Sequence, residues 1–278
     1  MIITYIPNET SFLELIYRRQ EACLISPAAK PGAHPVLITK VALRLERMAP
    51  MKLLAPFTKK SLSEQVKCLK GLFLGLGDPN LDLLKRIDEG AISLPSQAQN
   101  FFAIPNRQKN PNLFGSTESQ AIVRILDTLK YSRNGKFKND CRGKIEERHL
   151  RQTFRTIQSF RQLLDSQGNP SILIIPGQIG TCHCGRSPRR AWEVIERTPN
   201  EFAFGAFIVG IILLTHPECL EQNGDLQINC EEFDQTGLGT RFNYSLCYRF
   251  HDGFIRLGSK HSDEVYENSG SASGFLLE

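Results

Sequence analysis

The segment from Phe202 to Leu214 constrains the fold of this chain more than any other. Every residue in it is apolar or glycine, and as a helix it would span roughly 20 Å, shorter than the ~30 Å hydrocarbon core of a bilayer. A helix that is apolar on all sides must be covered by other elements. We therefore expect a buried core helix and no membrane span. Thr198 and Glu201 predict a capping box at its start.

The chain before this segment alternates between helical and extended patterns. Residues 146–164 have helical spacing. The side chains expected on the buried stripe of that helix or beside it are Leu150, Phe154, Ile157, Phe160, Leu163 and Leu164. Residues 171–175 predict a strand, and a glycine-rich loop then leads to Ser187 and Pro188, a typical helix start. Helix, strand, loop and helix form an α/β unit, in which ligands bind beyond the carboxyl end of the strand.

The residues after His216 favour strands. Strands are predicted at 225–230, 242–250 and 254–257, and His251-Asp252-Gly253 predicts a hairpin turn between the last two. The small residues from 270 to 274 predict a flexible segment or a tight turn. The expected fold class is α+β (mixed α/β), with a helix-strand-loop-helix core, a C-terminal antiparallel hairpin and a helical N-terminal region.

Two domains are expected along the chain. Residues 1–105 form a mixed N-terminal region, in which Ser11–Arg19 and Ser61–Leu74 have helical spacing and open with S-x-x-E capping boxes. Residues 103–115 are rich in proline and asparagine, which predicts a long loop or a boundary before an α/β core domain at 116–278. No secretory signal begins the sequence and the eight cysteines are scattered, which favours reduced thiols and a cytoplasmic location.

Basic residues are concentrated in the middle of the chain. From Lys130 to Arg190 there are 13 Lys and Arg against 4 Asp and Glu, a net charge of +9. From His216 to Glu278 there are 4 basic and 11 acidic residues, a net charge of −7. A cationic surface of this kind binds phosphate-bearing partners, whereas the alternative is an ordinary solvated face. The expected contacts in the basic segment are Lys136, Lys138, Arg148, Arg151 and Arg155.

The glycine-rich loop supplies a second group of candidate anion ligands. Residues 180–187 match G-x-x-x-x-G-[KR]-S and so resemble the phosphate-binding loop of P-loop nucleotidases. Arg186 stands where those loops place lysine, and Pro188 follows the serine, so the broader expectation is an anion site at a helix start. Its candidate residues are Gly180, Gly185, Arg186, Ser187, Arg189 and Arg190. Alternatively, the glycines only make the turn and the arginines face solvent.

The same loop carries a Cys-His-Cys sequence that allows two further kinds of chemistry. Cys182 and Cys184 could join His216 and Cys219 in a tetrahedral zinc site. The alternative for the latter two is a helix cap and a core thiol. A nucleophilic Cys182 or Cys184 is also chemically sensible, because a helix start and neighbouring arginines lower the pKa of a thiol. The candidate bases are His183, His216 and His251.

These motifs identify no family. Our leading expectation is a protein that binds a phosphate-bearing ligand, nucleic acid or another polyanion, through the basic segment and the arginines that follow the glycine-rich loop. One alternative is an enzyme, hydrolytic or nucleotide-acting, that uses the Cys-His-Cys loop as a thiol or zinc site. Another is a protein-interaction module without chemistry. Whether the chain is an enzyme is open at this point.

Overall fold

The structure is a computed structural model that describes residues 58–277, apart from positions 142, 223–225 and 240. These residues belong to one unit of the chain. Their strands form a nine-stranded sheet in the order β1-β4-β9-β6-β7-β8-β2, with β3 paired to β6 and β5 paired to β9. The fold is therefore mixed α+β, as the sequence predicts. The helix predicted over Ser11–Arg19 lies outside the described residues.

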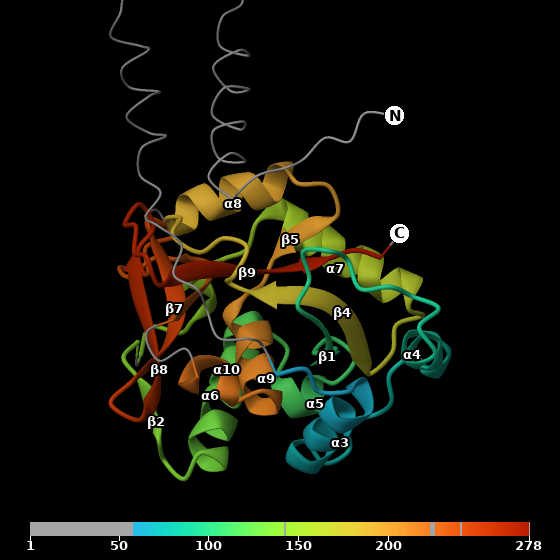
Figure 1. The fold of residues 1–278 in the computed structure, drawn as a ribbon. Helices are drawn as coiled ribbons and strands as arrows, with labels where there is room; N and C mark the ends of the chain where they lie inside the picture. Colours follow the sequence, from blue (N-terminus) through green and yellow to red (C-terminus); the bar gives the residue numbers. More distant parts are fainter. Residues whose placement is uncertain (1–57, 142, 223–225, 240, 278) are drawn as a thin grey trace, which may run out of the picture. The chain divides into compact units, whose positions relative to one another are not determined.

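Helices pack on both sides of this sheet. Figure 1 shows α7 and α8 on one side of β5 and β9, and α9, α6 and α3 on the other. The strands are β1 (Asn100–Pro105), β2 (Phe137–Asn139), β3 (Leu150–Arg151), β4 (Ile172–Ile179), β5 (Glu201–Ala203), β6 (Gln227–Phe233), β7 (Tyr244–His251), β8 (Phe254–His261) and β9 (Ser269–Phe275). The helices are α3 (Leu62–Leu72), α4 (Leu81–Asp88), α5 (Pro111–Phe114), α6 (Glu118–Ser132), the 3-10 helix η1 (Glu147–His149), α7 (Phe154–Ser166), α8 (Pro188–Arg197), α9 (Ala206–Thr215) and α10 (Glu218–Glu221).

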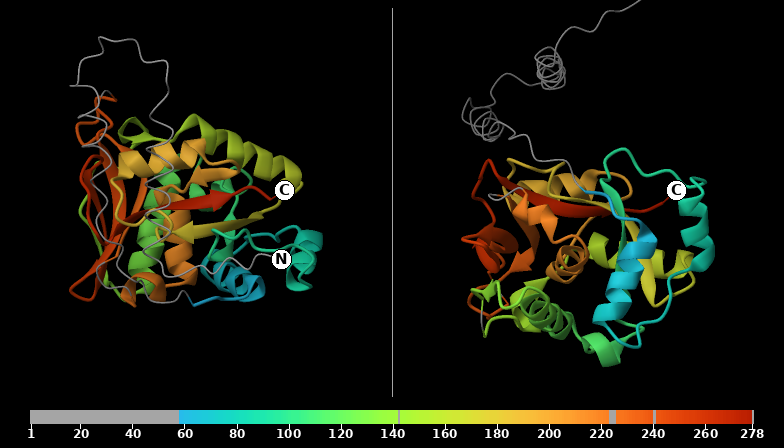
Figure 2. Two further views of the ribbon diagram at one scale, coloured as in Figure 1. Left: turned by 45° about the horizontal axis from the view of Figure 1, so that its top comes forward. Right: turned by 60° about the horizontal axis from the view of Figure 1, so that its bottom comes forward.

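Strands β7 and β8 form the antiparallel hairpin that the turn residues predict, and they pair along their whole lengths. In the turn, Asp252 has a φ of 53° and Gly253 a φ of 77°, the left-handed conformations that a type I′ turn requires. Figure 2 shows this hairpin, in red, and helix α4, in teal, at opposite sides of the described unit. The hairpin lies far along the sheet from β1, because β4, β9 and β6 stand between β1 and β7 in the strand order.

Strand β9 contradicts the expectation of a flexible segment or turn at 270–274. It pairs with β4 and β5 in antiparallel and with β6 in parallel direction, and all seven of its residues are buried. Its glycines allow close backbone packing, because a Cβ atom on Gly270 would collide with the Gly180 carbonyl oxygen, and one on Gly274 with the Phe204 ring. Small residues serve tight packing here, and chain flexibility does not explain them.

Helix α9 is the buried helix that the apolar segment predicts, and all ten of its residues are buried. In the part of the chain that the structure describes, no helix is both long and apolar enough to cross a membrane. Helix α9 begins only at Ala206, because Glu201–Ala203 pairs with β9 as strand β5. Thr198 ends α8 instead, where its hydroxyl donates to the Val194 carbonyl oxygen at 2.9 Å. The predicted capping box is therefore wrong.

Helix α7 is shorter than expected and buries a different side. It begins at Phe154, capped by the Thr153 hydroxyl, because Leu150–Arg151 pairs with β6 as strand β3. Two members of the predicted buried stripe are exposed, Phe154 at 71% and Ile157 at 38%. The stripe is wrong at these positions because α7 packs against β5 through other side chains, including Thr156, whose hydroxyl donates to the backbone of β5 at 3.3 Å.

Candidate functional site

The glycine-rich loop follows β4 and is held by hydrogen bonds of its own backbone. Gly180 has a φ of 99°, in the left-handed region that favours glycine. Its N–H donates to Gln178 Oε1 at 2.7 Å, and the Gly185 N–H donates to the Ser269 carbonyl oxygen at 2.9 Å. These amides are therefore paired inside the protein and do not converge on a common anion position.

At the start of helix α8, backbone N–H groups also have hydrogen-bond partners within the protein. The Ser187 hydroxyl accepts from the Arg190 N–H at 3.3 Å, and the Arg189 N–H donates to the Ser262 carbonyl oxygen at 3.0 Å. Ser187 and Pro188 thus start the helix as the sequence predicts. The Arg189 and Arg190 amides, two of the donors that would hold a phosphate at a helix start, therefore already have protein partners.

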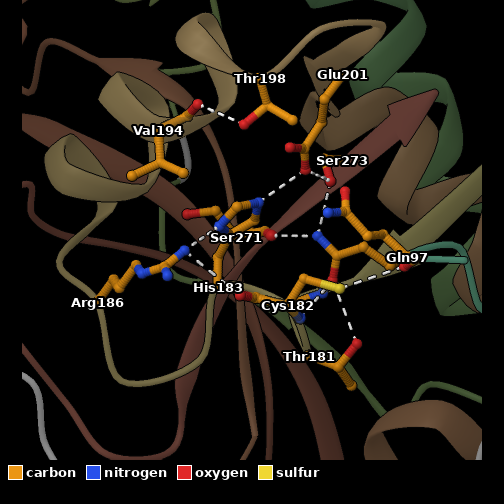
Figure 3. Close-up of polar contacts among 12 residues, drawn as sticks. Gln97, Thr181, Cys182, His183, Arg186, Val194, Thr198, Glu201, Ser271 and Ser273 are labelled. Carbon is orange, nitrogen blue, oxygen red and sulfur yellow. Dashed lines mark hydrogen bonds and ion pairs between the residues drawn. The ribbon is translucent and has the colours of Figure 1, made fainter. Parts of the chain in front are cut away.

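Behind the loop lies a buried group that we call the His183 cluster, consisting of His183, Arg186, Glu201 and Ser273 (Figure 3). Arg186 donates to His183 Nδ1 at 2.8 Å, and His183 Nε2 lies 2.7 Å from Glu201 Oε1. Because a guanidinium can only donate, Nδ1 is the acceptor and Nε2 carries the ring proton. Ser273 Oγ donates to the same Glu201 oxygen at 2.6 Å. The cluster thus joins the loop to β5 and β9.

The charges of the His183 cluster neutralise each other. His183 and Glu201 are 3% and 2% exposed. Burial alone would raise the pKa of Glu201, but hydrogen bonds from His183 and Ser273 outweigh it, so this pKa lies below its usual range. The ionised carboxylate balances the Arg186 guanidinium. Since both ring nitrogens of His183 are engaged, the histidine is a structural tie in this arrangement and has no nitrogen left to act as a base.

The two cysteines of the loop have separate partners. Cys182 is exposed and its Sγ lies 3.2 Å from the Gln97 carbonyl oxygen, whereas Cys184 is buried with its Sγ 3.2 Å from the Glu267 carbonyl oxygen. Burial raises the pKa of both thiols. A raised pKa reduces the thiolate fraction at neutral pH, which is the opposite of what a nucleophilic cysteine needs.

The four predicted zinc ligands are not brought together. Cys182 and Cys184 lie on the glycine-rich loop, whereas His216 and Cys219 follow helix α9, and the His216 ring packs edge-on against Phe102 of β1 at 5.5 Å between centroids. Among the residues that the structure describes, no three His, Cys, Asp or Glu side chains are grouped as metal ligands. Burial lowers the pKa of His216 to about 4, so it is neutral at physiological pH.

The three arginines expected on one helix face lie on separate elements. Arg148 is in η1, Arg151 in β3 and Arg155 in α7. Arg148 pairs with Glu146 at 2.9 Å, and Arg151 forms a two-pronged contact with Glu232 at 2.5 and 2.9 Å. Arg155 donates to three backbone carbonyl oxygens at and just beyond the end of α8, at distances between 2.5 and 2.8 Å. The expected row of arginines is therefore absent, because only Arg155 lies in helix α7.

The remaining arginines lie at the other end of helix α8. Arg189 pairs with Asp263 at 2.6 Å and Arg190 with Glu193 at 2.8 Å. Because α8 has ten residues, its two ends are about 15 Å apart. Arg155, at the last turn of α8, and the pair Arg189 and Arg190, at its first turn, therefore do not surround one point of the size of a phosphate.

The predicted lysine contacts lie on a third part of the surface. Lys136 is exposed directly before β2, and Lys138 in β2 lies 4.2 Å from the centroid of the Phe254 ring. Strand β2 is the last in the order of the sheet. A role for these lysines in ligand binding stays a prediction.

A concave surface on the β7–β8 hairpin has the features of a binding site that the predicted residues lack. We call it the Lys260 pocket. Its volume is about 400 Å³, within the range of roughly 300–1,000 Å³ typical of small-molecule sites. Its lining residues are Gln227, Tyr244, Cys247, Arg249, Gly258, Ser259, Lys260, His261, Glu264 and Tyr266.

The ammonium of Lys260 is buried without a counter-ion. Lys260 is 8% exposed, its Nζ donates to Ser269 Oγ, and it lies 4.7 Å from the centroid of the Tyr266 ring. No carboxylate of the described residues lies within ion-pair distance of it. Burial lowers the pKa of Lys260 to about 8, because desolvation penalises the charged form.

Neighbouring arginines add to the positive charge of the Lys260 pocket. Arg249 and Arg256 share one carboxylate, that of Asp140, at 3.4 and 3.1 Å. Glu264 lines the pocket but accepts a hydrogen bond from the Tyr266 hydroxyl at 2.7 Å. Positive charges thus outnumber negative ones on this side of the hairpin, although the surrounding C-terminal segment is acidic.

Alternate serines of β9 connect the Lys260 pocket to the His183 cluster. Ser269 Oγ donates to Asn229 Oδ1 at 3.1 Å, and Asn229 Nδ2 donates to Ser271 Oγ at 3.4 Å. Gln178 Nε2 then bridges the Ser271 carbonyl oxygen at 2.9 Å and Ser273 Oγ at 2.8 Å. Because alternate residues of a strand face the same side, these serines form a continuous buried polar row beneath the loop.

Sequence reasoning missed the Lys260 pocket, although two signals could have located it. Arg249, Arg256 and Lys260 are three of the four basic residues in the acidic C-terminal part. The alternation of the predicted strands places Arg249 opposite to the buried Leu246 and Tyr248, and in the structure Arg256 and Lys260 of the longer strand β8 lie on the same face as Arg249. Comparison of the chain with protein families, curated proteins and solved structures found no match.

Proposed function

We propose that the Lys260 pocket binds a phosphate-bearing ligand of about the size of a nucleotide, either free or as part of a nucleic-acid strand. The observation that carries this proposal is the Lys260 ammonium, which is 8% exposed and faces no carboxylate within ion-pair distance among the described residues. A buried charge without a counter-ion is costly. An anionic ligand removes that cost, because it supplies the missing negative charge inside the pocket.

Other lining residues favour phosphate over other anions. The Nε atom of Arg249 is buried and has no hydrogen-bond partner among the described residues, so a guanidinium donor remains for a phosphate oxygen. Tyr244 and Tyr266 line the same pocket and offer aromatic surface on which a base can stack. A cationic centre with aromatic walls suits a nucleotide, whose charge and ring lie at opposite ends.

Binding is tested by calorimetric titration with inorganic phosphate, with AMP and with a short single-stranded RNA of mixed sequence. The Lys260→Met variant removes the charge and keeps the length of the side chain. We expect about a tenfold or larger loss of affinity for AMP, or about 1.4 kcal/mol. The matched control is Lys67→Met, because Lys67 is exposed on α3 and its replacement should leave affinity unchanged. If RNA is the better ligand, its affinity falls steeply between about 50 and 200 mM salt.

A second variant blocks the pocket without touching its charges. Gly258 lies on β8 outside the left-handed region, and a Cβ atom there would lie 3.8 Å from Asp140 Oδ2, an ordinary contact. The backbone therefore tolerates Gly258→Leu, and the new side chain fills part of the pocket. The proposal is abandoned if none of the three probes binds at low salt, or if Lys260→Met and Gly258→Leu both bind AMP as the unmodified protein does.

A further inference from the structure

We propose that the protein has a second ligand site, in a groove beside helix α7, which binds a small apolar molecule that carries one carboxylate group, such as a medium-chain fatty acid. The α7 groove lies between α7, the end of β1 and the starts of α6 and α9, and its volume is about 260 Å³. This volume is near the lower limit of roughly 300 Å³ for small-molecule sites. None of its lining residues belongs to the Lys260 pocket.

The hydrophobic core forms the inner wall of the α7 groove. Ile104 of β1, Leu173 of β4 and Phe207 of α9 line the groove, and each of them is at most 4% exposed. Because these side chains are packed in the core, the fold itself sets their positions. The inner wall is therefore formed before a ligand arrives, and it favours a hydrocarbon or aromatic body.

Helix α7 forms the outer wall with apolar side chains that are only partly covered. Ile157, Phe160 and Leu164 line the groove and lie three and four residues apart, on one side of the helix. Ile157 is 38% exposed, and the other two are half-buried. The Phe160 ring packs edge-on against Phe202 of β5 at 5.4 Å between centroids, which fixes this wall. A hydrocarbon ligand covers apolar surface that the fold leaves in water.

Arg161 adds a positive charge to the same side of α7. It lies four residues after Ile157 and three before Leu164, and its side chain also lines the groove. No carboxylate of residues 58–277, where the structure describes them, lies within ion-pair distance of its guanidinium. A guanidinium in this situation can donate two parallel hydrogen bonds to a ligand carboxylate.

The other two charged residues of the groove neutralise each other. Arg107 Nε lies 2.8 Å from Glu118 Oε2. The turn that carries Arg107 is held by Asn106, whose Oδ1 accepts from the Gln108 N–H at 3.1 Å and whose Nδ2 donates to the Pro170 carbonyl oxygen at 3.0 Å. The lining of the groove thus contains one positive charge that is not balanced by a negative one, that of Arg161.

One unbalanced cation beside apolar walls defines the class of ligand. A carboxylate carries a single negative charge and matches the planar fork of a guanidinium. A phosphate dianion brings a second negative charge into a groove that Glu118 also lines, and a cation is repelled by Arg161. An uncharged apolar molecule contacts the walls but leaves the guanidinium unused. A monocarboxylate is therefore favoured over all three.

The test compares octanoate with 1-octanol, which has a chain of the same length but no charge, by saturation-transfer NMR on the whole protein at pH 7. Octanoate is ionised at this pH, and we expect it to bind about fivefold or more tightly than octanol. Arg161→Met removes the charge and keeps an unbranched side chain, so it should abolish this preference. The matched control is Arg197→Met, because Arg197 is an exposed arginine of α8 and its replacement should leave the preference unchanged.

A second pair of variants changes the wall beside the cation. The exposure of Ile157 lets the fold tolerate a polar side chain there. Ile157→Glu places a carboxylate one turn from Arg161, where it competes with the ligand for the guanidinium. We expect this variant to lose the preference for octanoate, whereas Ile157→Gln, which has the same shape without the charge, should keep it.

Several outcomes would overturn the proposal. If octanol binds as tightly as octanoate, or if Arg161→Met retains the preference, the groove does not select a carboxylate. If neither probe binds, the groove is not a site for a small apolar ligand. Excess AMP should not displace octanoate, and displacement would place both ligands in one site. Neither Lys260→Met nor Gly258→Leu changes a residue of the α7 groove, so this proposal and the proposed function fail independently.

Discussion

The His183 cluster and the Lys260 pocket are two ends of one buried polar row, yet they treat charge in opposite ways. In the His183 cluster, Arg186 and Glu201 neutralise each other through His183. In the Lys260 pocket, the ammonium has only a serine hydroxyl and an aromatic ring. A neutralised cluster ties loop to sheet, whereas an unneutralised cation weakens the fold unless something binds it. The difference separates a stabilising element from a candidate binding site.

The largest effect is expected from opening the neutralised cluster. Glu201→Ala removes the acceptor of His183 and Ser273 and leaves the partly buried charge of Arg186 without compensation. We expect the free energy of unfolding in urea to fall by about 3 kcal/mol. The control is Glu193→Ala, which breaks an ion pair on the surface of α8 and should cost less than about 1 kcal/mol. Equal losses in both variants would contradict a stabilising role for the cluster.

Substitution of Lys260 is expected to change the free energy of unfolding in the opposite direction, by stabilising the protein. Its pKa falls from 10.5 in the unfolded chain to about 8 in the folded protein, so below pH 8 the folded state carries an unfavourable buried charge. Lys260→Met should therefore raise the free energy of unfolding at pH 7, without ligand, by about 2 kcal/mol. The free energy of unfolding of the unmodified protein rises between about pH 8 and 10.5, so the difference between the variant and the unmodified protein becomes smaller in this range. Urea unfolding at neutral and alkaline pH measures this difference. A variant that is less stable than the unmodified protein at pH 7 would contradict the prediction.

The smallest effect concerns the thiol beside the neutralised cluster. Desolvation of the Cys182 sulfur raises the pKa of this thiol, although the residue as a whole is exposed, and the charges of Glu201 and Arg186 act on the pKa in opposite directions. We expect iodoacetamide to modify Cys182 about threefold or more slowly than free cysteine at pH 7. Mass spectrometry of the digested protein follows the reaction, and Cys182→Ser identifies the peptide. If Cys182 reacted faster than free cysteine, the cluster would activate the thiol, and the alternative of an enzyme with Cys182 as its nucleophile would be supported.

Elements that depend on neighbouring residues were predictable from the sequence. The capping box at Ser61 forms as expected, with both of its reciprocal hydrogen bonds. The turn at Asp252 and Gly253 joins β7 and β8 where the sequence places it. The apolar segment forms a fully buried helix. Each of these signals involves residues a few positions apart, so it needs no knowledge of the rest of the fold.

Elements that depend on distant partners were not predictable. Strand β5 includes Glu201, which the sequence predicts in a helical cap, because this residue pairs with Phe275 of β9, 74 positions along the chain. Arg151 leaves the predicted helix because strand β3 pairs with β6, where Glu232 meets it 81 positions away. In both cases the hydrogen bonds of a sheet outweigh a helical pattern, since tertiary context overrides weak local propensity.

The class of the fold, the buried helix, the hairpin and the position of the glycine-rich loop follow from the order of the residues, because local capping, turn chemistry and periodicity encode them. Which charges are neutralised depends on contacts between residues that are distant in the chain. Arg186 meets a buried Glu201 through His183, whereas the buried Lys260 meets the Ser269 hydroxyl and the Tyr266 ring but no carboxylate of the described residues within ion-pair distance. A count of charges along the chain cannot distinguish these cases, because burial and the distance to an opposite charge set the energy of each ion.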